Sequence, residues 1–417
     1  MRDWGRSLFA LTFFSVLGLL LAAGAPPEKK WFKGNTHTHT LWSDGDGAPE
    51  AVAAWYKEHG YQFLVLSDHN IIADVDKWFK VSEEKNSRLT QERLDKLVGR
   101  FGKKVEVREK DGKKEMRLQR LDELRAAFEE EGKFLFIKGE EITDKFVEKV
   151  KNDDPTAKPK TIERPIHHNS INHANLIKPP GGESVRDVLE KTIKAVEEEA
   201  AKCGKPVLVH LNHPNFGWGV ALEDLARVKG ERYFEVYNGH RGVRNYGDAA
   251  HPGTEKIWDT ALAMRLGEIG GPPLLALATD DAHHYHKDQA ISNPGRGWIV
   301  VRAESLAPDT IVRAMQAGDF YASSGVFLDD VVAGPRSLAV KIRREPGVSY
   351  TTRFIGTRAK GEPGVILMES EAAESAYEFK GDELYVRATV VSSRLHPNGY
   401  SAGDHESAWV QPVVPKR

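Results

Sequence analysis

Asn35-Thr36-His37-Thr38-His39-Thr40, followed at once by Ser43-Asp44-Gly45, is the stretch of sequence around which the chain is organised. In an extended segment the side chains alternate between two faces, so His37 and His39 lie on the same face. Asp44 comes five residues after His39 and can fold back toward the same point. Neutral imidazoles and a carboxylate are ligands that suit Zn, Mn or Fe, so the stretch predicts a metal site.

Length and composition place the chain among globular proteins with a substantial core. The 417 residues and the hydrophobic content of 40% favour more than one domain, or one large barrel with an appendage. Lys and Arg number 59 against 61 Asp and Glu, which gives a formal net charge of -2. Because nucleic-acid binding calls for a clustered basic surface, no nucleic-acid partner is expected.

The N-terminal segment 1–25 has the pattern of a secretory signal. Arg2 and Arg6 precede an uncharged apolar run over 8–25, and small residues at its end offer a cleavage site near Ala23. The run is also long enough to serve as an uncleaved membrane anchor. We therefore expect an exported protein, periplasmic or secreted, that touches the membrane only through such an anchor. Cys203 is the single cysteine, which excludes an intramolecular disulfide.

Several apolar, strand-like runs before about position 280 end in polar bursts rich in His, Asp and Glu. These bursts are Ser67-Asp68-His69-Asn70, Gly139-Glu140-Glu141, Asn212-His213-Pro214 and Asp280-Asp281-Ala282-His283. Alternation of strands and helices implies a parallel sheet. In a closed β/α barrel of about seven strands, all carboxyl ends open onto one face, where an active site lies. The pattern thus predicts an α/β fold with a TIM-like barrel and one polar mouth.

Two other segments differ in texture from the predicted barrel, which spans residues 30–325. Residues 72–131 are mostly charged and read as an insertion, with a hairpin signal at Asp111-Gly112. From residue 326 onward, short β-type runs alternate with Gly and Pro turns. Residues 326–417 are therefore predicted to form a small C-terminal β domain.

Taken together, the His-x-His stretch and the polar bursts resemble the polymerase-and-histidinol-phosphatase (PHP) superfamily in order and spacing. Glu235-Val236-Tyr237-Asn238-Gly239 and Tyr321-Ala322-Ser323-Ser324-Gly325 further resemble the branch with carbaryl-type carbamate hydrolases. The resemblance implies a distorted seven-stranded β/α barrel with two or three divalent metal ions. It also implies the ligands His37, His39, Asp44, His69, Glu141, His167, His213, Asp281 and His283.

Four of these ligands have a rival close by in the sequence. The rivals are Glu140 for Glu141, His173 for His167, His210 for His213 and Asp280 for Asp281. The Gly-x-Glu, His-Pro and Asp-x-His patterns of the family favour the chosen residue in three of these pairs. His167 is favoured because it directly follows an apparent strand.

The resemblance implies a metal-dependent hydrolase, foremost a phosphoesterase acting on a small anionic molecule. When bound, Zn, Mn or Fe ions supply activated water and polarise the bond under attack. A hydrolase of carbamate, ester or amide bonds is the nearest alternative, and a non-catalytic, metal-stabilised binding protein is a third.

Asp68 and Arg296 are the predicted catalytic side chains beside the metal ligands. Asp68 is expected to orient the His69 ring or to handle protons, with a turn-stabilising role as the alternative. Arg296 is expected to grip an anionic substrate, with a structural ion pair as the alternative.

Overall fold

The computed structural model describes residues 28–150 and 160–416. The predicted signal segment 1–25 lies outside these residues. Within the described ranges, no helix combines the length and the apolar character needed to cross a bilayer.

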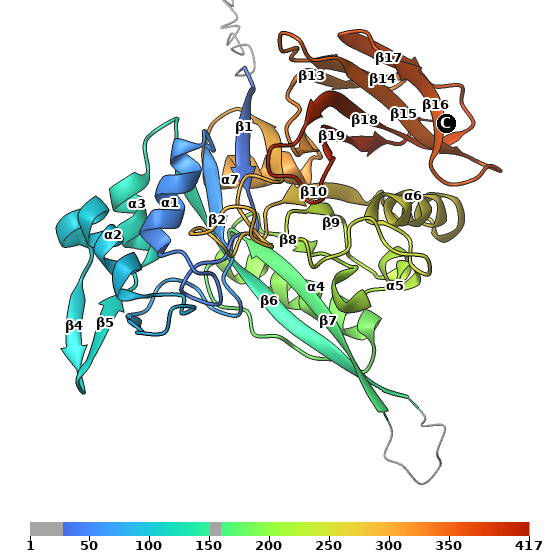
Figure 1. Ribbon diagram of the computed structural model, residues 1–417. Coiled ribbons are helices and arrows are strands. Elements are labelled where there is room, and N and C mark those ends of the chain that lie inside the picture. Colours follow the sequence, from blue (N-terminus) through green and yellow to red (C-terminus); the bar gives the residue numbers. More distant parts are fainter. Residues whose placement is uncertain (1–27, 151–159, 417) are drawn as a thin grey trace, which may run out of the picture.

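The main sheet of the molecule is mixed and has 13 strands (Figure 1). Its order is β10-β9-β8-β7-β6-β2-β1-β11-β12-β19-β18-β15-β16. The strands span β1 Lys30–Asn35, β2 Phe63–Leu66, β6 Leu135–Val150, β7 Lys160–Ile171, β8 Leu208–Leu211, β9 Tyr233–Asn238, β10 Leu275–Thr279, β11 Trp298–Ala303, β12 Phe320–Ser323, β15 Tyr350–Arg358, β16 Val365–Ser370, β18 Glu383–Leu395 and β19 His405–Val413.

Helices connect the strands of the range 30–325 and bury apolar faces against them. They are α1 Pro49–Glu58, α4 Val185–Cys203, α5 Leu222–Arg227, α6 Thr254–Met264 and α7 Pro308–Gln316, with short turns at η2 Phe216–Trp218 and η3 Arg265–Ile269. Ser184 caps α4 by accepting a hydrogen bond from the Asp187 N–H at 3.1 Å. Val188, Leu189 and Ile193 then recur on one buried face of that helix.

The predicted closed barrel is not confirmed, because the sheet mixes parallel and antiparallel pairs. β6 and β7 are antiparallel neighbours, since they are consecutive arms of one hairpin, and β1 pairs antiparallel with β11. At the outer edge, the β10 backbone pairs with β9. On its other side Ala276 exchanges two hydrogen bonds, of 2.9 and 2.8 Å, with the side-chain amide of Gln411 on β19. A side chain there occupies the place of a neighbouring strand.

The segment from position 326 onward continues the main sheet rather than standing apart from it. β19 pairs with β12, which joins the C-terminal strands to the strands of the range 30–325. A second sheet packs against them in the order β13-β14-β17, with bounds β13 Leu328–Ala333, β14 Ser337–Ile342 and β17 Glu374–Glu378. Leu338, Tyr377 and Val390 belong to their shared core.

The charged segment over 72–131 forms a small unit on one side of the molecule (Figure 1). It contains β3 Trp78–Lys80, α2 Gln91–Phe101, η1 Gly102–Lys104, β4 Val107–Lys110, β5 Lys113–Arg117 and α3 Leu121–Phe128. Asp111 and Gly112, with φ of 53° and 68°, connect β4 to β5. Two central residues with positive φ make the hairpin turn that was predicted there.

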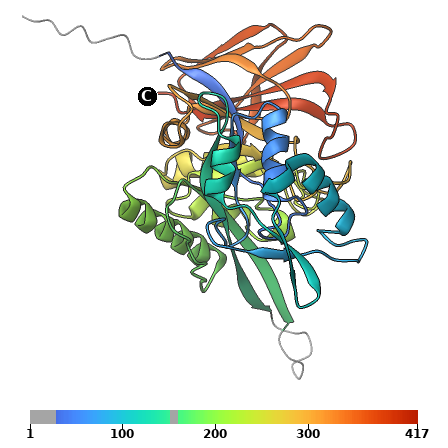
Figure 2. The ribbon, with the colours of Figure 1, turned by 90° about the vertical axis from the view of Figure 1, so that its left-hand side faces the viewer.

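The β6–β7 hairpin projects from the body, away from the C-terminal strands, in both views (Figures 1 and 2). At its base, where β6 enters the main sheet, the carboxyl ends of β1, β2, β8 and β10 also meet. The loops that follow these strands carry most of the predicted ligands.

Candidate metal centre

All nine predicted ligands lie in four overlapping groups whose donor atoms are within 4.8 Å of one another. The groups are His39, Asp44, His69 and His283; His37, His39 and Glu141; His37, His213 and Asp281; and His69, Glu141 and His167. Residues from 37 to 283 thus converge, because seven of them follow the carboxyl ends of β1, β2, β8 and β10, while Glu141 and His167 lie inside β6 and β7 beside the same point. The structure brings the predicted side chains together, and their role as ligands stays a prediction.

The innermost donors have the spacing of a metal coordination shell. His37 Nε2 and His39 Nε2 are 3.1 Å apart, and each lies 3.2 Å from Asp281 Oδ1. Glu141 Oε2 lies 3.4 Å from the first nitrogen and 3.3 Å from the second. Bonds of about 2.0–2.1 Å in a tetrahedral zinc site give donor–donor edges of about 3.3–3.4 Å. With either carboxylate oxygen, the two imidazole nitrogens form a triangle of donors whose edges fit a divalent transition-metal ion.

Glu141 presents its two oxygens to different groups, as a bridging carboxylate would. Oε1 lies 3.0 Å from His167 Nδ1 and 3.4 Å from His213 Nε2. Oε2 is buried and faces the His37–His39 pair and His69, whose Nδ1 lies 2.9 Å away, yet none of these contacts has the geometry of a hydrogen bond in the described structure. An orphaned buried carboxylate oxygen is costly unless a cation meets it, so the site fits a bound metal ion.

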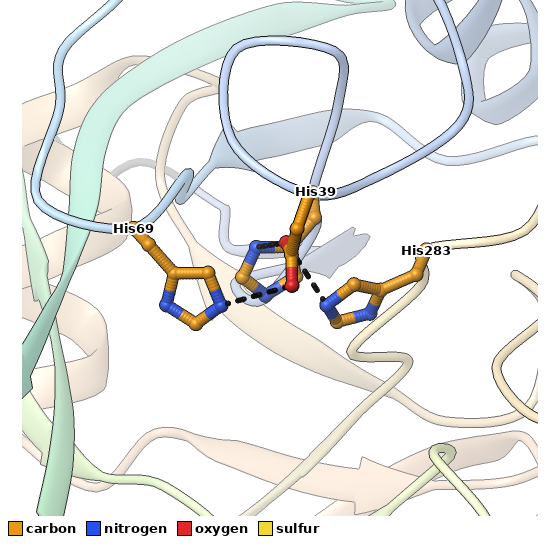
Figure 3. A group of neighbouring side chains, drawn as sticks. His39, His69 and His283 are labelled. Carbon is orange, nitrogen blue, oxygen red and sulfur yellow. Dashed lines mark ion pairs between the residues drawn. The ribbon is translucent and has the colours of Figure 1, made fainter. Parts of the chain in front are cut away.

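Asp44 is the most exposed member and gathers three imidazoles at the mouth of the site. Its carboxylate oxygens lie 3.5 Å from His39 Nδ1, 3.5 Å from His69 Nε2 and 3.3 Å from His283 Nε2. Figure 3 shows the three rings turned toward one another, with dashed lines marking the ion pairs. The side chain of Asp44 is 54% exposed, whereas that of His39 is fully buried. This outer group is therefore the part of the centre that a small molecule can reach.

The pKa values of the clustered side chains favour the binding of cations. Burial alone would raise the pKa of Glu141, but His69 and His37 outweigh it and hold this pKa well below its usual value. Burial lowers the pKa of His69, yet Glu141 and Asp44 raise it more strongly, to about 11. The carboxylates thus keep protons on imidazoles where no metal ion is bound. Metal ions would displace those protons.

Glu235, on β9, supports the candidate centre through hydrogen bonds. No role was predicted for it from the sequence. Its Oε1 lies 2.7 Å from His37 Nδ1 and accepts a 2.7 Å hydrogen bond from the Thr279 hydroxyl. Its Oε2 accepts from the His213 N–H and from Asn238 Nδ2, both at 2.8 Å. A carboxylate on one ring nitrogen leaves Nε2 of His37 free to bind metal. An acid inside a fully buried strand was the signal that could have revealed it.

Asp68 does not act on the His69 ring as predicted. It accepts hydrogen bonds from the backbone N–H groups of Thr40 and Ser43, at 2.8 and 3.0 Å, and from both of their hydroxyls. The His69 Nδ1 atom instead contacts the Thr143 hydroxyl at 2.5 Å. Asp68 therefore stabilises the turn that carries Asp44, which is the alternative reading of this residue.

The prediction that Arg296 grips an anionic substrate is wrong for this structure. The residue is fully buried, and its guanidinium donates to the backbone carbonyl oxygens of Gly239, Ala290, Ile291 and Asn398. Those bonds, of 2.7–3.0 Å, occupy the donors that a substrate would need. Arg296 joins three loops around the site.

The four rivals lie away from the shared donors. Glu140 Oε1 accepts a hydrogen bond from the Ile177 N–H at 2.7 Å, and the His173 Nδ1–H donates to the Asn175 carbonyl at 2.9 Å. Asp280 Oδ2 accepts from the Tyr56 hydroxyl at 2.9 Å. His210 is buried, with both ring nitrogens unpaired within the described residues, and belongs to none of the four groups.

Backbone strain gathers around the same point. Asn70, His213 and Asp281 are non-glycine residues with positive φ, of 50°, 23° and 48°. Each of them is a predicted ligand or follows one directly. Residues held in such sparsely populated conformations concentrate at functional sites, because surrounding contacts must enforce them.

A cavity of about 330 Å³ lies above the cluster. Seven of the nine predicted ligands line it, and its walls also contain Phe216, His240, Val243 and His284. Among the residues that the structure describes, no lysine or arginine lines it. Such a cavity admits a small molecule and offers it one apolar wall.

No known protein-family model matches the chain, and no curated protein matches it. Several solved structures are similar to it, two of them as follows. One is a two-domain protein from Bacteroides vulgatus ATCC 8482, named as containing a predicted PHP-like metal-dependent phosphoesterase. Its sequence is 14% identical, the match covers 92% of this chain and 95% of that chain, and the TM-score is 0.39. The other, from Bifidobacterium adolescentis ATCC 15703, has a name that suggests a metal-dependent phosphoesterase; it is 12% identical, with 63% and 92% covered and a TM-score of 0.30.

Proposed function

We propose that the protein is a metal-dependent hydrolase of small molecules, foremost a phosphoesterase. The observation that carries the proposal is the convergence of six imidazoles and three carboxylates beneath a cavity open to solvent. Two or three divalent ions of Zn, Mn or Fe, when bound there, supply activated water and polarise the bond under attack. PHP membership is part of this proposal and rests on the motif resemblance.

The protein's own residues would hold and shape this centre. Glu235 sets the tautomer of His37, and Glu141 reaches two groups of donors with one side chain. Asp68 and Arg296 hold the loops that carry the outer ligands. A centre built on such bonded supports is preorganised, which is what electrostatic stabilisation of a transition state requires.

Hydrolysis of a carbamate or carboxylic ester is the second candidate. It is favoured by the apolar wall of Phe216 and Val243 and by the lack of lysine or arginine among the described cavity residues. A neutral substrate with an apolar leaving group suits such a wall. A phosphate monoester suits the same site only if bound ions neutralise its charge.

A matched set of chromogenic substrates separates these candidates. The full chain, loaded in turn with Zn, Mn and Fe, is assayed with 4-nitrophenyl phosphate, 4-nitrophenyl N-methylcarbamate and 4-nitrophenyl acetate, which share one leaving group. A phosphoesterase turns over the phosphate with the highest kcat/KM and loses that activity with a chelator. Preference for the carbamate or acetate selects the second candidate. No turnover at full metal occupancy would support the third alternative, a non-catalytic binding protein.

Export is part of the proposal and is supported by the charge and hydropathy pattern of residues 1–25. Expression of the full gene in a bacterium, followed by separation of periplasm, membrane and cytosol, tests it. Recovery in the cytosol at full mass would contradict export.

A further inference from the structure

His240 lies beside the metal centre without belonging to any of its four donor groups. It lines the cavity together with Asp281 and His283, and its ring centroid is 5.6 Å from that of His283. Its backbone N–H donates to Asn238 Oδ1 at 2.8 Å. Asn238 Nδ2 in turn donates to Asp281 Oδ2 at 3.1 Å. The side chain that fixes the position of a predicted ligand therefore also fixes the position of His240.

A backbone hydrogen bond sets the tautomer of the His240 ring. The Gly242 N–H donates to His240 Nδ1 at 3.1 Å, so this nitrogen carries a lone pair and the ring proton lies on Nε2. A Cβ atom at position 242 would lie 2.8 Å from Cε1 and 3.0 Å from Nδ1 of the ring. Gly242 has no positive φ, so glycine is required there by the approach of the ring rather than by the backbone conformation.

The Nε2–H group of His240 is left as a donor without a protein acceptor. No described group of the chain forms a hydrogen bond with it, and Nε2 is not one of the buried unpaired polar atoms. Solvent therefore reaches this nitrogen on a residue that lines the cavity. With no lysine or arginine among the described lining residues, the cavity has few other donors to offer a negatively charged oxygen.

We propose that His240 is a catalytic residue that contacts the substrate and donates a hydrogen bond from Nε2–H to an oxygen of the scissile group. The proposal rests on the hydrolase function proposed above. A neutral imidazole that released this proton would become an imidazolate, so His240 stabilises developing charge and does not transfer the proton. The substrate class that this donor fits is an ester with an anionic, or developing anionic, oxygen over the ions.

Three variants test the proposal on the full-length, zinc-loaded chain. His240→Ala removes the donor, His240→Gln keeps an N–H near the position of Nε2, and Gly242→Ala displaces the ring without touching the cavity. His251→Ala, at a histidine whose side chain is 43% exposed and stacks on Trp218, serves as the control. For each protein, kcat and KM, metal content and the dissociation constant of inorganic phosphate are measured.

Loss of one such donor is expected to lower kcat by about 10²-fold in His240→Ala and to weaken phosphate binding about tenfold, with metal content little changed. His240→Gln should recover most of both losses, and Gly242→Ala should resemble His240→Ala. Wild-type kcat and phosphate affinity in His240→Ala would overturn the proposal, as would parallel loss of metal.

Phosphate binding also separates the two proposals. If the wild type hydrolyses none of the aryl substrates, the proposed function fails, while the phosphate measurements still decide whether His240 donates to a bound oxyanion. Nitrogen NMR of histidine-labelled protein adds a direct check, because the Nε2–H tautomer of His240 should be present in the wild type and perturbed on adding phosphate.

Discussion

Two buried clusters of charge in this molecule have opposite character. In one, the Arg387 guanidinium donates to both carboxylate oxygens of Asp259 at 2.7 and 2.8 Å, and the Tyr385 hydroxyl donates to the same carboxylate at 2.8 Å. In the other, the Nε2 atoms of His37 and His39 lie 3.2–3.4 Å from the facing oxygens of Asp281 and Glu141, and Glu141 Oε2 makes no hydrogen bond of acceptable geometry within the described residues.

The difference shows how a complete structural ion pair is told from a ligand site. Donors and acceptors in the Asp259–Arg387 pair match one to one, so nothing further is needed to stabilise it. In the candidate metal centre, the Nε2 atoms of His37 and His39 and the facing oxygens of Asp281 and Glu141 lie at distances that suit a shared cation better than mutual hydrogen bonds. The first cluster joins α6 to β18, whereas the second has donor atoms that remain available to coordinate an ion.

The largest effect on metal binding is expected from removing the carboxylate of Glu141. Glu141→Gln should lower metal affinity and kcat/KM more than about 100-fold, since loss of even an outer-sphere partner costs about 10–100-fold. Glu140→Gln is the matched control, because this neighbouring buried carboxylate points to the opposite face of β6 and accepts from Ile177. Equal metal content in the two variants would contradict the assignment.

The structural pair should respond in stability rather than in metal content. Arg387→Met leaves Asp259 buried without its partner and should lower the free energy of unfolding by about 3–5 kcal/mol. Urea denaturation measures this loss, and elemental analysis of the folded variant should find the wild-type number of ions. A loss of metal without a loss of stability would reverse the roles given to the two clusters.

Glu50 represents a third case, a buried carboxyl with no hydrogen-bond partner for its side chain in the described structure. Burial raises its pKa from 4.5 to about 7. Because the folded-state pKa is the higher one, the wild type loses stability as the pH rises from about 4.5 to 7, where only the unfolded chain ionises readily.

Glu50→Gln removes this ionisation. The stability of the wild type relative to the variant should therefore fall by up to about 3 kcal/mol between about pH 4.5 and pH 7.5. Urea midpoints of both proteins at the two pH values measure the change. A difference that is independent of pH would show that the Glu50 carboxyl ionises normally in the folded protein.

Arg296→Lys should give the smallest functional effect. With the guanidinium bonded to loop carbonyls, the substitution should lower thermal stability but change KM less than about twofold. A KM increase of tenfold or more for a hydrolysed aryl substrate would restore the original prediction that Arg296 binds the substrate.

The gathering of the cluster could be predicted because strand ends and period-two alternation are local properties. His37 and His39 share a face of an extended segment, and Glu140 and Glu141 point to opposite faces of β6. Polar bursts after apolar strands converge wherever neighbouring strands run in the same direction. These patterns predicted that the polar residues gather at one point, and the resemblance to the PHP superfamily implied which nine side chains would be the ligands.

What could not be predicted depends on contacts between distant segments. The carbonyls that occupy Arg296 come from positions 239, 290, 291 and 398, and nothing in the local sequence indicates them. Likewise, the bond between Gln411 and Ala276 spans 135 positions and replaces the strand pair that a closed barrel would need. Glu235 lies within an apolar strand pattern that hid its contact with His37.

The central claim is that the cluster holds metal ions, and elemental analysis of the purified full chain tests it most directly. The variant with His37→Ala and His39→Ala serves as the comparison, and Mn, Fe and Zn are supplied during expression. Two or three ions per chain, falling sharply in the double variant, is the predicted result. Fewer than about half an ion per chain in the wild type under all three supplies would contradict it.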